Sequence, residues 1–164
     1  MFAGKSTELV RRYERALRAR RRAVVLRHAA DVRPYARHGD RASDSVLGRP
    51  VTTAAEVASS AEGAQVVLID EIQFMAASEA PELIQVLRAT PAAVTVFGLD
   101  LDASGAPFGA MPALMAEADS VVKLRAVCDC GAEATRTQRL RPGATVGGAE
   151  AYRAVCRGCW RPCA

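Results

Sequence analysis

Short apolar runs alternate with amphipathic stretches along most of the chain, and this alternation constrains the fold more than any other feature. The runs are rich in Val, Ile and Leu, as buried parallel strands are, and the stretches between them repeat apolar residues at helical spacing. Parallel strands need long crossover connections, which helices supply. We therefore expect an α/β fold in which helices flank a parallel sheet.

The same pattern predicts approximate boundaries. We expect strands at Ala23–His28, Ala64–Glu71, Ala92–Asp100 and Ser120–Val127. We expect helices from about Lys5, over Thr52–Ala61 with Thr52 or Thr53 as N-cap, and over Ser78–Ala89 and Gly109–Ala118. The polar stretch after the first strand is rich in Asp, Arg, Gly and Pro, which predicts a long loop.

The composition changes after Val127, where cysteine, glycine and arginine replace the apolar runs. Four of the five cysteines form two close pairs, Cys128 with Cys130 and Cys156 with Cys159. In a reducing compartment such pairs favour zinc over disulfides. We therefore expect an α/β domain over 1–127 and a zinc-ribbon module over 128–164, which is too small to be stable on its core alone. The C-x-C spacing of the first pair is irregular, so a ligand from Cys163 or water, or reduced thiols without metal, stay open as alternatives.

The chain has 164 residues, of which 50% are hydrophobic and 24% charged, which suits one globular domain with a small appendage. Its apolar runs are far shorter than the roughly 18 residues of a membrane span, and its N-terminus lacks the pattern of a secretory signal. We expect a soluble, cytoplasmic protein with no membrane partner. Arginines cluster at 11–22, but Glu8 and Glu14 dilute them, so we interpret them as a solvated helix face and expect no nucleic-acid partner.

The opening residues carry the second half of a phosphate-binding motif. Gly4, Lys5 and Ser6 match the end of G-x-x-x-x-G-K-[ST], in which backbone N–H groups hold phosphates, the lysine reaches the β/γ oxygens and the hydroxyl meets magnesium. Lys5 is one of only two lysines, the other being Lys123. A chance match at a capped helix is the alternative. Because the first half of the motif is missing, we expect the sheet to lack the strand before it, and the chain to begin at an internal methionine or to be a fragment.

Two carboxylates, Asp70 and Glu71, end the apolar run VVLIDE. In open α/β sheets, ligands bind at the carboxyl ends of the strands. In phosphoryl transfer an aspartate at this place supports magnesium, and a neighbouring carboxylate accepts a proton from the attacking hydroxyl. P-loop ATPases and helicases carry the same pair, so it indicates nucleotide chemistry without naming the acceptor. A simple cap of the next turn is the other interpretation.

Together these motifs resemble the thymidine kinase family of type II, the cytosolic tetrameric enzymes related to P-loop ATPases. The resemblance is carried over nearly the whole chain by MFAGKST with ELVRR, then ADVRPY, LIDEIQF, GLD, PFG, KLRAVC, ATRTQR, VGGAEAY and CRGC. The chain departs from the family at Ala103, where an aromatic residue is usual, at the C-x-C pair and at the missing first strand.

The resemblance implies transfer of the γ-phosphate of ATP, bound with Mg²⁺, to the 5′-hydroxyl of thymidine, in nucleoside salvage for DNA synthesis. It implies a homotetramer with structural Zn²⁺, Glu71 as general base, and Ser6 and Asp70 at the magnesium. The implied phosphate-binding residues are Gly4, Lys5, Ser6, Thr7, Asp31 and Arg33. The implied thymidine-binding residues are Met1, Phe74, Thr137, Val146, Gly147, Gly148 and Tyr152. A lasso loop at about Leu140–Tyr152 would close over the base, although its two glycines also suit a hairpin turn.

Two other functions stay open. A nucleic-acid-dependent P-loop ATPase with a zinc ribbon would use the same GKST and strand-end carboxylates, but a helicase core needs a second α/β domain for which this chain has no room. A binding-only relative would hold a nucleoside or nucleotide without catalysis, because its phosphate loop is truncated. The retention of Lys5, Ser6, Asp70 and Glu71 argues against that second alternative.

Overall fold

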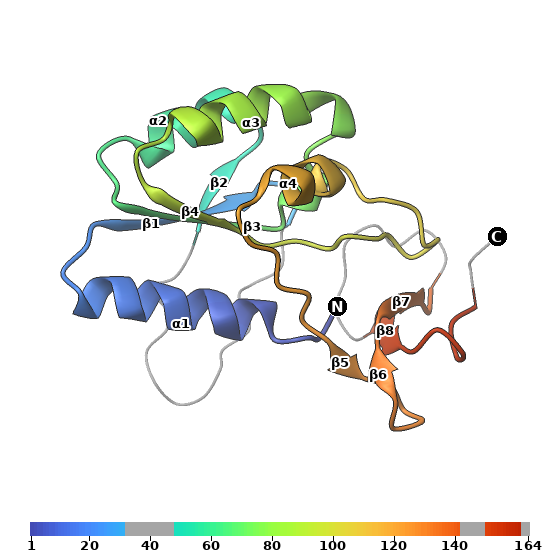
Figure 1. Cartoon of the computed structure of the whole chain (residues 1–164). Helices are drawn as coiled ribbons and strands as arrows, with labels where there is room; N and C mark the ends of the chain where they lie inside the picture. The colour runs from blue at the N-terminus through green and yellow to red at the C-terminus, as the bar shows by residue number, and fades with distance from the viewer. Residues whose placement is uncertain (32–47, 142–149, 162–164) are drawn as a thin grey trace.

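Four parallel strands form a sheet at the centre of the molecule, with helices on both faces (Figure 1). The computed structural model describes residues 1–31, 48–141 and 150–161. Its helices are α1 Lys5–Arg18, α2 Ala54–Ala61, α3 Ala80–Ala89 and α4 Met111–Glu117, with short 3-10 turns η1 Ile72–Phe74 and η2 Ala77–Glu79. Its strands are β1 Ala23–His28, β2 Arg49–Val51, β3 Val66–Asp70, β4 Ala93–Val96, β5 Ala126–Val127, β6 Glu133–Ala134, β7 Arg136–Arg139 and β8 Tyr152–Val155.

The sheet has the strand order β2-β1-β3-β4, and every pair in it is parallel. Because side chains alternate along a strand, β3 sends Val67 and Ile69 to one face and Leu68 to the other. The first face packs against α2, α3 and α4, and the second packs against α1, as Figure 1 shows. This confirms the expected α/β fold with a parallel sheet flanked by helices.

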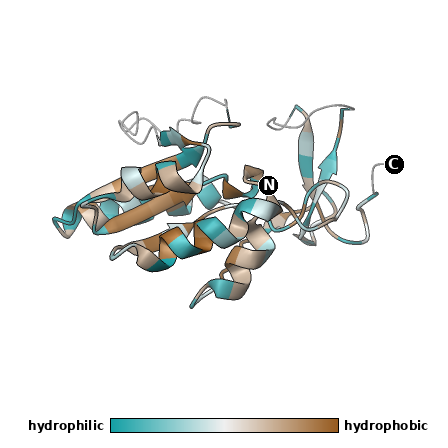
Figure 2. Cartoon of the chain, turned by 90° about the horizontal axis from the view of Figure 1, so that it is seen from above, coloured by the Kyte–Doolittle hydropathy of each residue, from teal (hydrophilic) through white to brown (hydrophobic). Residues whose placement is uncertain are grey.

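Helix α1 is held to the sheet by a narrow apolar stripe. Leu9 is fully buried against Val25, Leu68 and Phe97, and burying such a side chain contributes about 1.5–3 kcal/mol. Figure 2 shows the strands of the sheet mostly brown, whereas the helices mix teal and brown along their length. The prediction that this helix starts at Lys5 is confirmed.

Helix α2 begins with a capping box, in which the Thr53 hydroxyl accepts from the backbone N–H of Glu56 and the Glu56 carboxylate accepts from the Thr53 N–H. Thr53 is therefore the N-cap, one of the two residues expected. Helix α3 starts two residues later than predicted, because Ala77–Glu79 form a 3-10 turn before Pro81 at the first helical turn.

The predicted strand Ser120–Val127 is wrong for most of its length. Residues 120–125 run without strand pairing, and only Ala126 and Val127 pair, with β6 of the C-terminal part and not with the sheet. Val121 and Val122 are exposed. An apolar run becomes a strand only where a partner strand offers hydrogen bonds, and among the described residues the sheet ends at β4.

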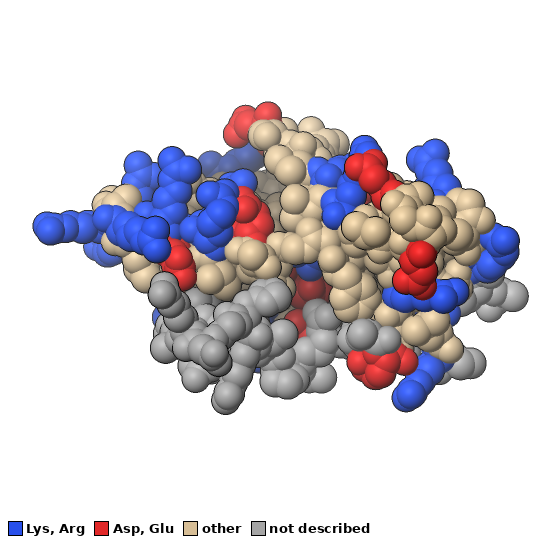
Figure 3. All heavy atoms as spheres, turned by 90° about the horizontal axis from the view of Figure 1, so that it is seen from below, with Lys and Arg blue, Asp and Glu red and all other residues tan. Residues whose placement is uncertain are grey.

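Basic side chains gather on the face of the molecule that α1 covers, toward the C-terminal end of that helix (Figure 3). Several are paired within the helix, since Glu8 accepts from Arg11 and Arg12, and Glu14 accepts from Arg18. None of the helices in the described ranges is long and apolar enough to cross a bilayer.

Candidate active site

Lys5 meets the two predicted carboxylates at the edge of the sheet. Its Nζ lies 2.8 Å from Glu71 Oε1 and 3.7 Å from Asp70 Oδ1. Lys5 is the first residue of α1, whereas Asp70 ends β3, so a helix N-terminus and a strand carboxyl end converge here. Both carboxylates are nearly fully buried. The helix N-terminus and the lysine suit a phosphate group, and the two carboxylates beside them suit a hard cation.

Glu71 has a strained backbone, with φ 54° in the left-handed region that a non-glycine residue rarely occupies. Such strain is retained at sites where the surrounding structure fixes the residue. The turn directs its carboxylate toward Lys5, while its N–H donates to Asp70 Oδ1 over 2.9 Å. The Glu71 carboxylate is therefore bonded to Lys5, while Asp70 Oδ1 accepts from the Glu71 backbone and lies 3.7 Å from the same ammonium.

Gln73, which no sequence motif indicated, holds the other oxygen of Glu71. Its Nε2 donates to Glu71 Oε2 over 2.5 Å, and its Oε1 accepts from the backbone N–H of Leu99 over 3.1 Å. Its side chain is only 1% exposed. The signal in the sequence was a polar residue two positions after the carboxylate, within the otherwise apolar stretch IQFM. Gln73 thus links the carboxylate at the end of β3 to the segment after β4.

The other residues of the expected phosphate site lie at the same edge of the sheet. Gly4 is the N-cap of α1, and Ser6 and Thr7 are exposed in its first turn, where backbone N–H groups have no acceptor within the helix. Asp31 follows β1 and is buried, and its carbonyl accepts from Arg27 Nη1 over 2.6 Å. Arg33 lies outside the described residues.

The expected thymidine-binding residues fall into two groups. Met1 lies beside Thr137, to whose hydroxyl its amino group donates over 3.3 Å, and it packs against the buried pair Ala103 and Tyr152. Phe74 belongs to a second group, made of aromatic rings. Its ring lies edge-on to that of Phe108, with centroids 5.6 Å apart, and tilted to that of His28, with centroids 6.0 Å apart. Val146, Gly147 and Gly148 of the expected lasso lie outside the described residues.

The segment after β4 connects these two groups. Phe108 donates its backbone N–H to the Asp100 carbonyl over 3.1 Å, and Ala103 lies in the turn between them. Ala103 is buried against Tyr152 despite its small side chain. The departure from an aromatic residue at this position is therefore accommodated by packing from Met1, Ala151 and Tyr152.

All four paired cysteines come together in the C-terminal part of the chain. The four sulfur atoms lie within 4.8 Å of one another, and Cys130 Sγ is 3.7 Å from Cys156 Sγ. Tetrahedral zinc with Zn–S bonds near 2.3 Å requires sulfurs about 3.8 Å apart, so the donor set fits zinc. The irregular C-x-C pair fits because Gly131 donates to the Cys128 carbonyl over 2.8 Å, which closes a tight turn. Cys163 lies outside the described residues.

The thiols also influence one another electrostatically. Backbone N–H groups of Cys130 and Cys156 stabilise the thiolate and lower the pKa of Cys128 to about 6. The sulfurs around Cys159, with that of Cys156 foremost, raise the pKa of Cys159 to about 12. A Zn²⁺ ion held by the four sulfurs would favour the thiolate form of Cys159 as well.

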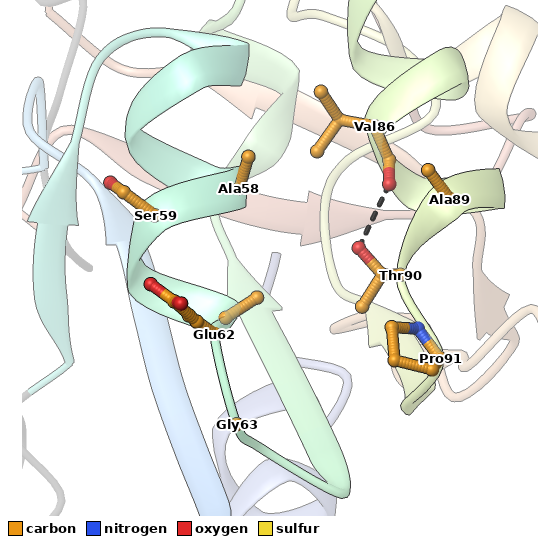
Figure 4. Close-up of a pocket in the computed structure, with 9 residues that line it drawn as sticks. Ala58, Ser59, Glu62, Gly63, Val86, Ala89, Thr90 and Pro91 are labelled. Carbon is orange, nitrogen blue, oxygen red and sulfur yellow. Dashed lines mark hydrogen bonds between the residues drawn. The ribbon is translucent and has the colours of Figure 1, made fainter.

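A groove of about 500 Å³ lies elsewhere, between the ends of α2 and α3 (Figure 4). It is formed where α2 turns at Gly63 toward β3 and where α3 ends before β4, at the amino ends of both strands. Its lining includes Val86, Glu62 and Thr90, and the Thr90 hydroxyl donates to the Val86 carbonyl over 2.8 Å. Ligands of open α/β sheets bind at the opposite edge, where Asp70 lies. We therefore take the Lys5 site as the candidate active site.

Known proteins match this chain over nearly its whole length. A family model described as thymidine kinase matches residues 1–160. A thymidine kinase from Coprothermobacter proteolyticus is 39% identical over 170 residues, covering 95% of this chain and 84% of that protein. Thymidine kinases from Deinococcus radiodurans and Pyrobaculum aerophilum are each 42% identical, covering 96% of this chain and 84% and 92% of the respective relatives. The match therefore includes both the segment Gly4–Ser6 and the cysteine cluster.

Proposed function

The chain belongs to the thymidine kinase family, and we propose that it transfers the γ-phosphate of ATP to the 5′-hydroxyl of thymidine. The observation that carries the proposal is the convergence of Lys5, Asp70 and Glu71 at the N-terminus of α1. A helix N-terminus with a lysine can bind the phosphates of the donor, and a carboxylate beside the transferred group can serve as the base for a hydroxyl acceptor. Both are present within the same few ångströms.

Binding of ATP would change the partner of Lys5. Its ammonium now lies 2.8 Å from Glu71, and a charged lysine bonded to the base lowers the tendency of that base to accept a proton. Phosphate oxygens at the first turn of α1 would attract Lys5 away from Glu71. The donor would thereby release the Glu71 carboxylate for the acceptor hydroxyl, so that the base becomes active when the nucleotide is bound.

We assign the remaining roles on the family resemblance and on these positions. Gly4, Lys5, Ser6 and Thr7 would bind the phosphates, with Asp31 and Arg33 nearby. Ser6 and Asp70 would hold Mg²⁺, which neutralises charge on the phosphates. Glu71 would accept the proton of the 5′-hydroxyl, with Gln73 holding its carboxylate.

The base of thymidine would be bound by Met1, Phe74, Thr137, Val146, Gly147, Gly148 and Tyr152. The proximity of Met1, Thr137 and Tyr152 supports this assignment. The cysteine cluster would hold a structural Zn²⁺ that fixes the 128–164 module. On the family resemblance we also propose a homotetramer acting in nucleoside salvage, in the cytoplasm, where a reducing environment keeps the cluster thiols available.

The two lysines allow a matched test of the proposal. Purified protein with ATP, Mg²⁺ and thymidine is expected to yield thymidine monophosphate and ADP in equal amounts. Lys5→Ala should lower kcat by at least ~10²-fold, as loss of a charge on the transferred phosphate does, whereas Lys123→Ala should retain it because Lys123 is exposed and pairs with Asp100. Thymidine binding without product would favour the binding-only alternative, and ATP hydrolysis stimulated by DNA would favour the ATPase.

A further inference from the structure

The turn Asp102–Ala106 lies between the cysteine cluster and the residues assigned to thymidine. On one side its Ala103 is buried against Tyr152 and Ala151, with Met1 packed beside them. On the other side its Gly105 lies directly against the ring of Trp160. Trp160 follows the metal-ligand candidate Cys159, so the turn touches both parts of the molecule.

The turn itself is tightly bonded. Asp102 Oδ1 accepts from the backbone N–H groups of Ser104 and Ala106 over 2.9 and 3.0 Å. The Gly105 N–H donates to the Asp102 carbonyl over 3.1 Å, and the Asp102 N–H donates to the Ala106 carbonyl over 2.9 Å. Because these bonds cross-connect the whole turn, a displacement at Gly105 would be transmitted to Ala103.

Contact between Gly105 and Trp160 leaves no space for a larger residue. A methyl group on Gly105 would lie 2.7 Å from Cη2 and 3.0 Å from Cζ2 of the indole. The ring is confined from behind, since it packs against Cys128, Ala134 and Val155, and the Arg136 guanidinium lies 5.9 Å from the ring centre. The backbone N–H of Trp160 donates to Cys156 over 3.0 Å. The position of the ring is thus set by the cysteine cluster.

Packing, and not hydrogen bonding, holds this ring. The indole Nε1 is buried and has no hydrogen-bond partner among the described residues. A buried N–H without a partner is unfavourable, so the indole is held at this position by the apolar contacts of its ring.

From these contacts we propose that Trp160 is a positioning residue. Through its contact with the turn Asp102–Ala106, it makes the thymidine side of the candidate active site depend on whether the cysteine cluster holds a metal. The proposal rests on the proposed function. Zinc in the cluster holds the indole against Gly105 and keeps the wall formed by Ala103 and Tyr152 in place. Loss of zinc releases the ring and loosens that wall, so thymidine affinity depends on the metal although no cysteine reaches the substrate.

Gly105→Ala tests the contact, and Gly63→Ala is its matched control. Both glycines have positive φ, 85° and 70°, so alanine is strained at each, but a methyl at Gly63 meets nothing within 4 Å. Trp160 is the single tryptophan, so its fluorescence reports the ring directly. Gly105→Ala is expected to shift the emission to longer wavelength and to raise the KM for thymidine about 5-fold or more, with kcat and the KM for ATP changed little. Gly63→Ala should match wild type in all four.

Two further measurements separate coupling from simple damage. Trp160→Phe removes the outer indole atoms without breaking a hydrogen bond, so adding it to Gly105→Ala should return the thymidine KM to within about twofold of Trp160→Phe alone. Removing zinc from wild-type protein with a chelator should reproduce the emission shift and the higher thymidine KM, and adding Zn²⁺ back should reverse both.

The outcomes distinguish this inference from the proposed function. If wild-type protein is folded but neither binds nor phosphorylates thymidine, the proposed function fails and this inference fails with it. If wild type is active but Gly105→Ala has the thymidine KM of Gly63→Ala, the function stands and the positioning role is overturned. An unchanged emission spectrum in Gly105→Ala, or in the zinc-free protein, would likewise overturn it.

Discussion

Replacing Gln73 by leucine should both destabilise the protein and slow the reaction. Leucine has nearly the volume of glutamine but can neither donate to Glu71 nor accept from the Leu99 N–H, the two hydrogen bonds that Gln73 makes. Gln73 is only 1% exposed, so water cannot replace those partners. At ~1–3 kcal/mol for each buried group left unsatisfied, and with Glu71 still bonded to Lys5, we expect the free energy of unfolding to fall by about 2–4 kcal/mol.

The matched control is Gln65→Leu. Gln65 also accepts a backbone N–H, that of Arg22 over 3.0 Å, but it is exposed, so water satisfies the N–H and the cost should stay below ~1 kcal/mol. Urea unfolding followed by circular dichroism gives both values, and kcat at saturating thymidine gives the effect on Glu71. Equal stabilities of the two variants, together with a kcat for Gln73→Leu close to that of wild type, would refute the role given to Gln73.

Three further changes test separate parts of the structure. Hydrogen bonds from two arginines of α1 lower the pKa of Glu8 from 4.5 to about 2, so wild type should exceed Glu8→Gln in stability at pH 7 by less than ~1 kcal/mol. That difference should shrink as the pH falls from about 4.5 toward 2, because the stabilising ionised form is then lost; a pH-independent difference would contradict the assignment. Thr53→Ala removes the N-cap of α2 and should cost ~1 kcal/mol in thermal unfolding, whereas Thr52→Ala should cost less. Metal analysis should find about one zinc per chain, and Cys130→Ser should reduce it; a folded wild type that contains no zinc and takes none up when Zn²⁺ is added would refute the zinc site.

The α/β core could be predicted because its information is local. The apolar run at β3 and the helical spacing that begins at Lys5 can be recognised without knowing which other elements they pack against. The N-cap of α2 could be narrowed to Thr52 or Thr53 for the same reason, since capping depends on residues only a few positions apart, and the structure selects Thr53. The run Ser120–Val127 was not, because its apolar residues say nothing about whether a strand is available to pair with them.

The same distinction applies to the candidate active site. Lys5 was predicted from the GKS segment, and Asp70 and Glu71 from their place at the end of an apolar run, and the structure brings the three side chains together. Gln73 was missed because its role depends on Leu99, which is distant in the sequence and approaches only through β4. The contact of Trp160 with Gly105 depends in the same way on how the C-terminal part packs against the segment after β4.

The most direct test of the account is the kcat for thymidine phosphorylation by Glu71→Gln, with Glu117→Gln on the exposed end of α4 as the control. Glutamine keeps the size of the side chain but cannot accept the proton, so kcat should fall by ~10²–10⁴-fold while zinc content and thymidine affinity stay near wild type. Glu117→Gln should leave kcat unchanged, since that carboxylate pairs with Arg88 at the surface. A folded, zinc-loaded Glu71→Gln protein with a large fraction of wild-type kcat would contradict the central claim that Glu71 is the base.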